Sequence, residues 1–238
     1  YVQRRIDEGA SPATVNKALA FIRGMFAKSV HWGYLSVDPT QNVSTLKTEE
    51  LSPDALTEQQ VEDLLTVLKG KCSYSVVLVA VDTGLRWQEL RRLTWGDVDW
   101  NFGDFGSIEV GKSKAKNFRV VPLTERVHSH LKDKYEQAQE NSKVVPLMKK
   151  LPVLPSPLDS STPFFDVRRP LSAAGYKIGI GHIHLHQLRH TWATRLRDKE
   201  VPLDRIMELG GWSSYAMVQK YAKSRPTHLI KAIAALNV

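Results

Sequence analysis

Three short clusters of the sequence hold side chains that could act together on a phosphodiester. They are TGLRWQEL at positions 83–90, HQLRHT at 186–191, and LGGW at 209–212, which is followed nine positions after its tryptophan by Tyr221. Cutting a phosphodiester builds negative charge on its nonbridging oxygens. The planar guanidinium groups of Arg86 and Arg189 present forks of donors that match two such oxygens, so this pair could stabilise the charge without a metal ion.

The order and spacing of these clusters resemble the two arginine boxes and the tyrosine box of the tyrosine recombinase (phage integrase) family. Between the first two clusters lies the basic stretch SKAKNFRVVPL at 113–123, which resembles the lysine hairpin of that family. The resemblance spans about residues 11–238, nearly the whole chain. One short motif recurs by chance, whereas four in the family's order make a specific signal.

The resemblance implies catalytic roles for a set of side chains. Tyr221 would be the nucleophile, because a phenoxide can attack the scissile phosphorus and leave a 3′-phosphotyrosine that stores the bond energy for religation. His186 would be its general base, and Lys114 would protonate the departing 5′ oxygen. Lys114 stands eight residues before Pro122, which is the family's separation. The remaining members of the implied catalytic set are Arg86, Arg189 and Trp212.

Three further features of the clusters follow from the same resemblance. Trp212 occupies a position where the family more often has histidine, and an indole can donate a hydrogen bond but cannot exchange protons. Glu89 matches the acidic residue of the first arginine box and would orient neighbouring groups. The basic side chains of the hairpin would contact DNA, and they are Lys112, Lys116 and Arg119.

Each assignment also has a plainer structural alternative. Arg86 could be a surface arginine at the start of a helix, and Arg189 could form an ion pair with a carboxylate such as Glu208. Glu89 could be a surface glutamate, and Lys114 could track phosphates without transferring a proton.

The tyrosine and the histidines have alternatives of their own. Tyr221 could be a half-buried aromatic on an amphipathic helix, and Tyr215 is a competing tyrosine, although the spacing from Trp212 selects Tyr221. The histidines at 182, 184 and 186 alternate, so on a strand they would share one face and could mimic a zinc site. The lack of a cysteine nearby argues against zinc.

Periodicity and capping residues predict the elements that carry these clusters. Ser11-Pro12 predicts a helix start, and the TEQQ sequence at 57–60 has the spacing of a capping box. Residues 72–81 form a buried helix or a strand, and 107–110 with 118–121 predict a hairpin. The six prolines between 144 and 170 predict a long surface excursion without regular helix. Helices should resume at 188–197, 203–209, 215–221 and 228–236.

We therefore expect a mainly α fold with small β elements. Residues 57–238 would form a tyrosine recombinase catalytic domain, and 1–46 the C-terminal part of a helical core-binding domain that lacks its beginning. The polar stretch at 47–56 would be the linker between them.

Composition narrows the class of protein. The 238 residues contain 33 basic and 25 acidic side chains, a net charge of +8, which favours a polyanionic partner. Residues 111–150 alone hold ten basic side chains against four acidic ones. Cys72 is the only cysteine, so an intrachain disulfide framework is excluded, and the sequence shows no signal peptide and no membrane span. We expect a cytoplasmic, DNA-associated protein without a membrane partner.

The function implied by the resemblance is site-specific cutting and rejoining of DNA, with no cofactor, for a mobile element rather than for chromosome resolution. Double-stranded DNA would be the partner, and a homotetramer would assemble on it. The helix at 228–236 would either dock on a neighbouring protomer or pack back on its own domain. Accessory DNA-bending or directionality proteins could take part. Two other functions stay open: DNA relaxation like that of a type IB topoisomerase, and a catalytically silent architectural role in binding DNA.

Overall fold

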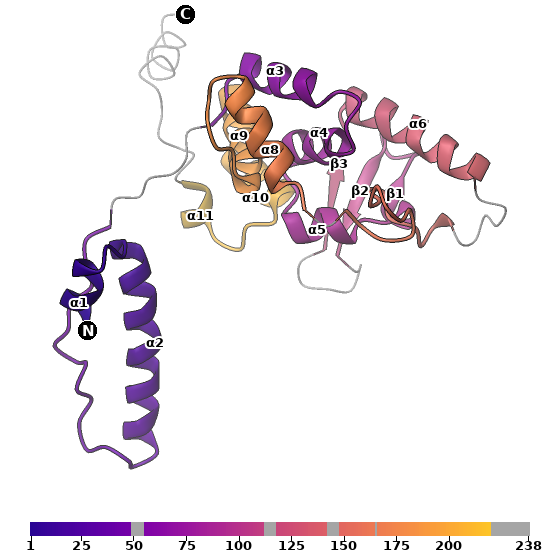
Figure 1. Ribbon diagram of the computed structural model, residues 1–238. Helices are drawn as coiled ribbons and strands as arrows, with labels where there is room; N and C mark the ends of the chain where they lie inside the picture. Colours follow the sequence, from indigo (N-terminus) through magenta and orange to yellow (C-terminus); the bar gives the residue numbers. More distant parts are fainter. Residues whose placement is uncertain (49–54, 112–117, 142–147, 165, 220–238) are drawn as a thin grey trace, which may run out of the picture. The chain divides into compact units, whose positions relative to one another are not determined.

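The computed structural model describes residues 1–48, 55–111, 118–141, 148–164 and 166–219 (Figure 1). The chain divides into two compact units, Tyr1–Ser52 and Pro53–Val238, and this division falls inside the segment at 47–56. None of the helices in the described ranges is long and apolar enough to span a membrane.

The first unit is built on one long helix. Helix α1 (Val2–Asp7) precedes α2 (Pro12–His31), and the Ser11 hydroxyl caps α2 by accepting from the backbone N–H of Thr14, as the sequence predicts. The segment after α2 returns alongside it, because the Asn16 side chain both donates to and accepts from the backbone of Leu46, at 2.8 and 2.9 Å. Only two side chains of α2 are buried, Val15 and Leu19.

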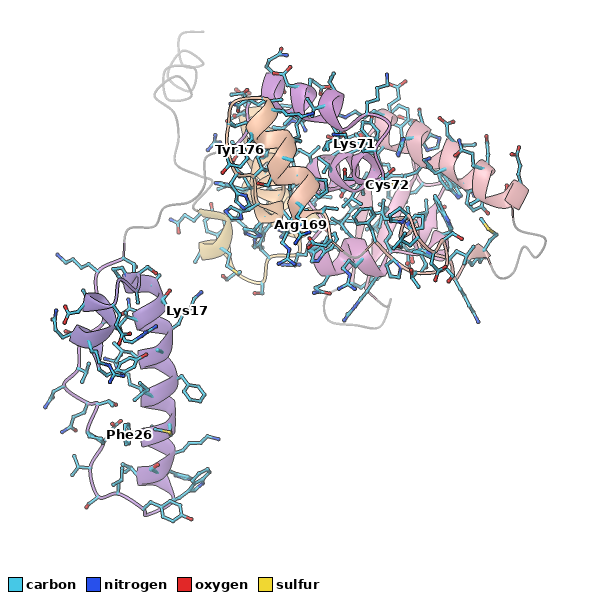
Figure 2. All side chains as sticks on the ribbon, viewed as in Figure 1. Lys17, Phe26, Lys71, Cys72, Arg169 and Tyr176 are labelled. Atoms are coloured by element: carbon cyan, nitrogen blue, oxygen red, sulfur yellow. The ribbon has the colours of Figure 1, made fainter. Side chains whose placement is uncertain are left out.

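The second unit is built around a buried helix, α4 (Ser73–Thr83). Nearly every side chain of α4 is buried, so the apolar run that could have been a strand is a helix covered on all sides. Cys72 lies exposed just before it, next to Lys71 (Figure 2). The helices that pack against α4 are α3 (Glu58–Leu68), α5 (Trp87–Arg92), α6 (Glu125–Asn141), α8 (Arg168–Lys177) and α9 (Leu185–Asp198).

A small antiparallel sheet contains the predicted hairpin. Strand β2 (Ser107–Val110) pairs with β3 (Arg119–Pro122), with Ile108 opposite Val121. A short strand that the sequence did not indicate, β1 (Val98–Asp99), follows the 3₁₀ turn η1 (Trp95–Asp97) and pairs with the other side of β2. Strand β3 is therefore an edge strand, and it lies beside α10 (Leu203–Gly210).

The proline-rich segment differs from the expected surface excursion. Instead of running only over the surface, it buries Val153 and Phe164, and the Val153 N–H donates to the Leu93 carbonyl at 2.9 Å. Prolines break helices but still form bridges and bury apolar atoms, and proline fits the first turn of a helix. Helix α8 accordingly begins at Arg168 with a proline in that turn, and the sequence did not predict this helix. Arg169 and Tyr176 mark its two ends (Figure 2).

The C-terminal helices of the second unit follow the predicted order. Helix α9 begins at Leu185 with His184 as its N-cap, so the alternating histidines do not lie on a strand. Helices α10 and α11 (Tyr215–Gln219) come next, and a second apolar cluster forms among Trp192, Ala193, Ile206, Trp212 and Val218. The predicted helix at 228–236 lies outside the described residues.

A buried ionic cluster joins α4 to α6 and α9. Both carboxylate oxygens of Asp82 accept from Arg126, at 2.5 and 2.6 Å, and Arg195 and Thr124 also donate, at 3.1 and 2.9 Å. Burial alone would raise the pKa of Asp82. The hydrogen bonds and charge of Arg126, with those of the other two donors, outweigh burial and hold this pKa below its ordinary value.

We predict that Asp82→Asn destabilises the chain by about 3 kcal/mol at neutral pH, because it leaves two arginines without their buried counter-charge. The native pKa of Asp82 is depressed, so its contribution is present above the unfolded pKa and is lost as pH falls through the native value. Denaturant unfolding at several pH values measures this loss. The control is Asp166→Asn, whose partner Arg168 is 77% exposed and which should cost less than about 1 kcal/mol.

Candidate active site

The centre of the site is the C-terminal end of α10. Gly211 adopts a left-handed conformation, with φ of 64°, and its N–H donates to the carbonyl of Glu208. The N–H of Trp212 donates to the carbonyl of Met207, which completes a Schellman turn. The last carbonyls of the helix still need donors, and they lie at the negative end of the helix dipole.

Three successive carbonyl oxygens of this turn each accept a hydrogen bond from a different arginine. The three arginines come from the start of α5, from β3 and from α9, which lie far apart in the sequence. The carbonyl of Leu209 accepts from Arg119 Nε at 2.8 Å, that of Gly210 from Arg189 Nη2 at 2.6 Å, and that of Gly211 from Arg86 Nη2 at 2.7 Å.

Arg86 is the most accessible of the three arginines. It is the N-cap of α5, and its backbone N–H donates to Glu89 Oε2 at 2.7 Å, while its Nη1 donates to Glu89 Oε1 at 3.0 Å. Its side chain remains 42% exposed. The plain surface role that the sequence left open does not describe this arginine, because Glu89 and the α10 turn fix its guanidinium.

Glu89 links Arg86 to Arg119. Arg119 donates to both carboxylate oxygens of Glu89, at 3.0 and 2.8 Å. Burial alone would raise the pKa of Glu89, but hydrogen bonds from Arg119 and from the Arg86 backbone N–H, with the charge of Arg119, hold it below its ordinary value. Glu89 is therefore ionised at neutral pH and is not a simple surface glutamate.

The position of Arg119 corrects a prediction from the sequence. We expected this side chain to contact DNA with the rest of the hairpin, but it is only 7% exposed and its fork is directed at Glu89. The cause is the alternation of side chains along β3, where positions 119 and 121 are buried and 120 and 122 face outward.

Arg189 is buried beneath Trp212. It is 2% exposed, its Nη1 donates to the carbonyl of Gly84 at 2.5 Å, and its Cζ lies 4.0 Å from the centre of the Trp212 ring. The ion pair with Glu208 that the sequence left open is not formed. Glu208 pairs instead with Arg205, at 3.1 Å.

The glycine that precedes the turn makes room for Trp212. A Cβ atom on Gly210 would lie 1.9 Å from the Trp212 ring, so no larger residue fits there. Trp212 also stacks on Trp192, with ring centres 6.1 Å apart and planes inclined by 24°. The double glycine thus has a packing reason, since the indole occupies space that a side chain at position 210 would need.

The other predicted residues are only partly described. His186 lies exposed in the first turn of α9, three residues before Arg189 and on the same helix face. Tyr215, the competing tyrosine, is the first residue of α11 and is 54% exposed. Within the described ranges no cluster of three potential metal ligands forms, the alternating histidines included. The predicted residues that lie outside the described ranges are Lys112, Lys114, Lys116 and Tyr221.

Sequence reasoning missed the backbone part of the site. The carbonyls of Gly84, Leu209, Gly210 and Gly211 organise the arginines, and backbone groups leave no residue-type signal. Trp192, which stacks on Trp212, was also not singled out, although the spacing of four between Leu188 and Trp192 indicates an apolar helix face.

Comparison with known proteins identifies the family. Residues 54–228, most of the chain, match the model of the phage integrase family. The chain belongs to the phage integrase family. It is 30% identical to the integrase of Salmonella phage P22, over 92% of this chain and 56% of that protein. It is 29% identical to the tyrosine recombinase XerC of Thermodesulfovibrio yellowstonii, over 97% of this chain and 78% of that protein.

Solved structures have the same fold as this phage integrase family member. A Tn1549 transposon integrase in complex with a circular intermediate DNA superposes with a TM-score of 0.77, at 19% identity, over 99% of this chain and 83% of that one. The family match and this structural likeness together confirm the expected family and the expected mainly helical fold with a small sheet. The chain spans about half the length of the P22 integrase.

We predict that Gly211→Ala destabilises this family member more than Gly179→Ala does. Both positions have positive φ, so alanine costs about 1 kcal/mol of backbone strain at either one. A Cβ at 179 meets nothing within 4 Å, whereas at 211 it lies 2.8 Å from Arg119 Nη1, which adds roughly 1–3 kcal/mol of overpacking. Denaturant unfolding measures both. Equal losses would contradict the close packing of Arg119 against this turn.

Proposed function

We propose that this chain cuts and rejoins double-stranded DNA at a specific site through a 3′-phosphotyrosine, in the service of a mobile element. The observation that carries the proposal is the anchorage of Arg86 and Arg189 on neighbouring carbonyls of one turn, within a family match that extends past Tyr221. The likeness to a phage integrase and the transposon integrase supports the mobile-element role.

The arginines would stabilise the charge that develops on the scissile phosphate. Arg86, with its exposed side chain, would contact a nonbridging oxygen directly. Arg189 would add positive charge from beneath Trp212, in a setting where low solvent access strengthens electrostatic interactions. Glu89 would keep Arg86 oriented, since it accepts one hydrogen bond from the Arg86 guanidinium and one from the Arg86 backbone N–H.

The bond changes would follow from the side chains that the family resemblance assigns. The Tyr221 oxygen would attack the phosphorus as His186 takes its proton, and the bond from phosphorus to the 5′ oxygen would break. Lys114 would give the leaving oxygen its proton. Attack of a 5′ hydroxyl on the phosphotyrosine would then rejoin the strand, so the sequence of steps needs no cofactor and no nucleotide.

The proposed assembly has several copies of the chain on DNA. Residues 57–238 would cut the DNA, and 1–46 would belong to a core-binding domain that helps to clamp it, joined by the segment at 47–56. A homotetramer would exchange strands in pairs, with residues 228–236 docking between protomers and accessory DNA-bending or directionality proteins taking part. Lys112 and Lys116 would contact phosphates. Strand cleavage and exchange would take place on DNA in the cytoplasm.

We predict that Tyr221→Phe abolishes covalent attachment to a nicked suicide substrate, because phenylalanine lacks the attacking oxygen. Denaturing gel electrophoresis of the protein–DNA adduct measures this. Tyr215→Phe is the matched control, since Tyr215 is an exposed tyrosine six residues earlier, and it should leave adduct formation intact. An adduct that persists in Tyr221→Phe, or disappears only in Tyr215→Phe, would overturn the assignment of the nucleophile.

We also predict that Arg86→Ala lowers the rate of adduct formation by roughly a hundredfold to a thousandfold, because it removes an aligned donor from the charged transition state. The control is Arg168→Ala, which removes an exposed arginine of the same unit that pairs with Asp166. Single-turnover rates at saturating protein separate cleavage from binding. A loss in Arg86→Ala no larger than that in Arg168→Ala would argue against a role of Arg86 in the chemistry.

A further inference from the structure

We infer that Arg119 is a positioning residue that holds Arg86 in place, and this inference rests on the proposed cleavage reaction. Arg119 is the first residue of β3, the second strand of the hairpin, and its side chain is 6% exposed. A guanidinium so well covered is unsuited to contact a DNA phosphate. Its donors instead meet groups that also bind Arg86.

The first shared group is the carboxylate of Glu89. Glu89 Oε1 accepts from Arg119 Nη1 and from Arg86 Nη1, both at 3.0 Å. Glu89 Oε2 accepts from Arg119 Nη2 at 2.8 Å and from the Arg86 backbone N–H at 2.7 Å. Each oxygen is therefore held from both sides. Without Arg119, the half-buried carboxylate would keep one charged partner and could rotate with Arg86.

The second shared group is the turn after α10. Arg119 Nε donates to the carbonyl of Leu209 at 2.8 Å, and its guanidinium packs against the Cα of Gly211, where a Cβ would lie 2.8 Å from Nη1. The carbonyl of Gly211 is the other acceptor for Arg86, at 2.7 Å. Both anchors of Arg86 are thus contacts of Arg119.

The geometry requires a guanidinium. Two parallel donors face the two oxygens of Glu89, and a third donor in the same plane faces the Leu209 carbonyl. A lysine ammonium at this position keeps the charge but cannot meet three acceptors in one plane. Arg119→Lys therefore separates the role of shape from that of charge.

The test compares Arg119→Lys with the wild-type chain in three measurements. We expect the rate of adduct formation on a nicked suicide substrate to fall roughly tenfold to a hundredfold, since small misplacements of catalytic groups cost that much. DNA affinity and its salt dependence should change less than about twofold. Amide hydrogen exchange at Gly211 and Trp212, whose N–H groups close the turn, should become faster.

The matched control is Arg126→Lys. Arg126 also donates to both oxygens of a buried carboxylate, that of Asp82 on α4, so the variant should lose comparable stability while keeping the adduct rate and the exchange at Gly211. A combined Arg119→Lys and Arg86→Ala variant should cleave no more slowly than Arg86→Ala alone, because Arg119 acts through Arg86.

Three outcomes would overturn the inference. They are an unchanged adduct rate in Arg119→Lys, an equal loss in Arg126→Lys at matched stability, and a salt slope reduced by about one in Arg119→Gln, which would mark Arg119 as a phosphate contact. If the wild-type chain forms no adduct, the proposed function fails, and hydrogen exchange at Gly211 and Trp212 still decides whether Arg119 holds the turn. If Arg119→Lys does not fold, Arg119→Gln replaces it with the same expectations.

Discussion

The C-terminal end of α10 has carbonyl oxygens that need hydrogen-bond donors, and this requirement determines how the three arginines are arranged. The last turn of α10 satisfies two of its carbonyls within its own Schellman turn, and it leaves the next three to be bound from outside. Each is bound by a charged donor, an interaction worth roughly 1.5–3 kcal/mol. Because the donors come from α5, β3 and α9, the hydrogen bonds that satisfy the end of α10 also bring the three arginines together. The site is therefore stabilised by ordinary folding forces.

Bringing three guanidinium groups to one turn creates repulsion that the fold must offset. The helix dipole contributes negative partial charge, and Glu89 contributes a full negative charge shared by Arg86 and Arg119. The depressed pKa of Glu89 reflects the same balance. Among the described residues, three cations and one carboxylate leave two net positive charges, and in the proposed reaction these would face the phosphodiester.

The sequence predicted the local elements better than it predicted the contacts and burial of individual side chains. The capping box at Thr57, the β2–β3 hairpin and the order of the C-terminal helices were predicted, because caps and periodicity are local signals. Burial of the proline-rich segment was not, since it depends on backbone pairing with residues 93–96 that no local pattern reveals. Arg119 was misassigned for a different reason. Its positive charge suggested DNA, although its two-residue offset from buried Val121 already placed it on the inner face of β3.

The two arginines of the boxes differ in a way that bears on catalysis. Arg189 is held between two glycine carbonyls and an indole ring, so in the proposed reaction its charge would need no reorganisation. Arg86 has an exposed side chain, which suits direct contact with a phosphate but leaves its orientation to be set by neighbours. An exposed guanidinium that must be aligned needs a rigid carboxylate, and a rigid carboxylate in this half-buried position needs a second cation. This chain of requirements explains why Glu89 and Arg119 lie behind Arg86.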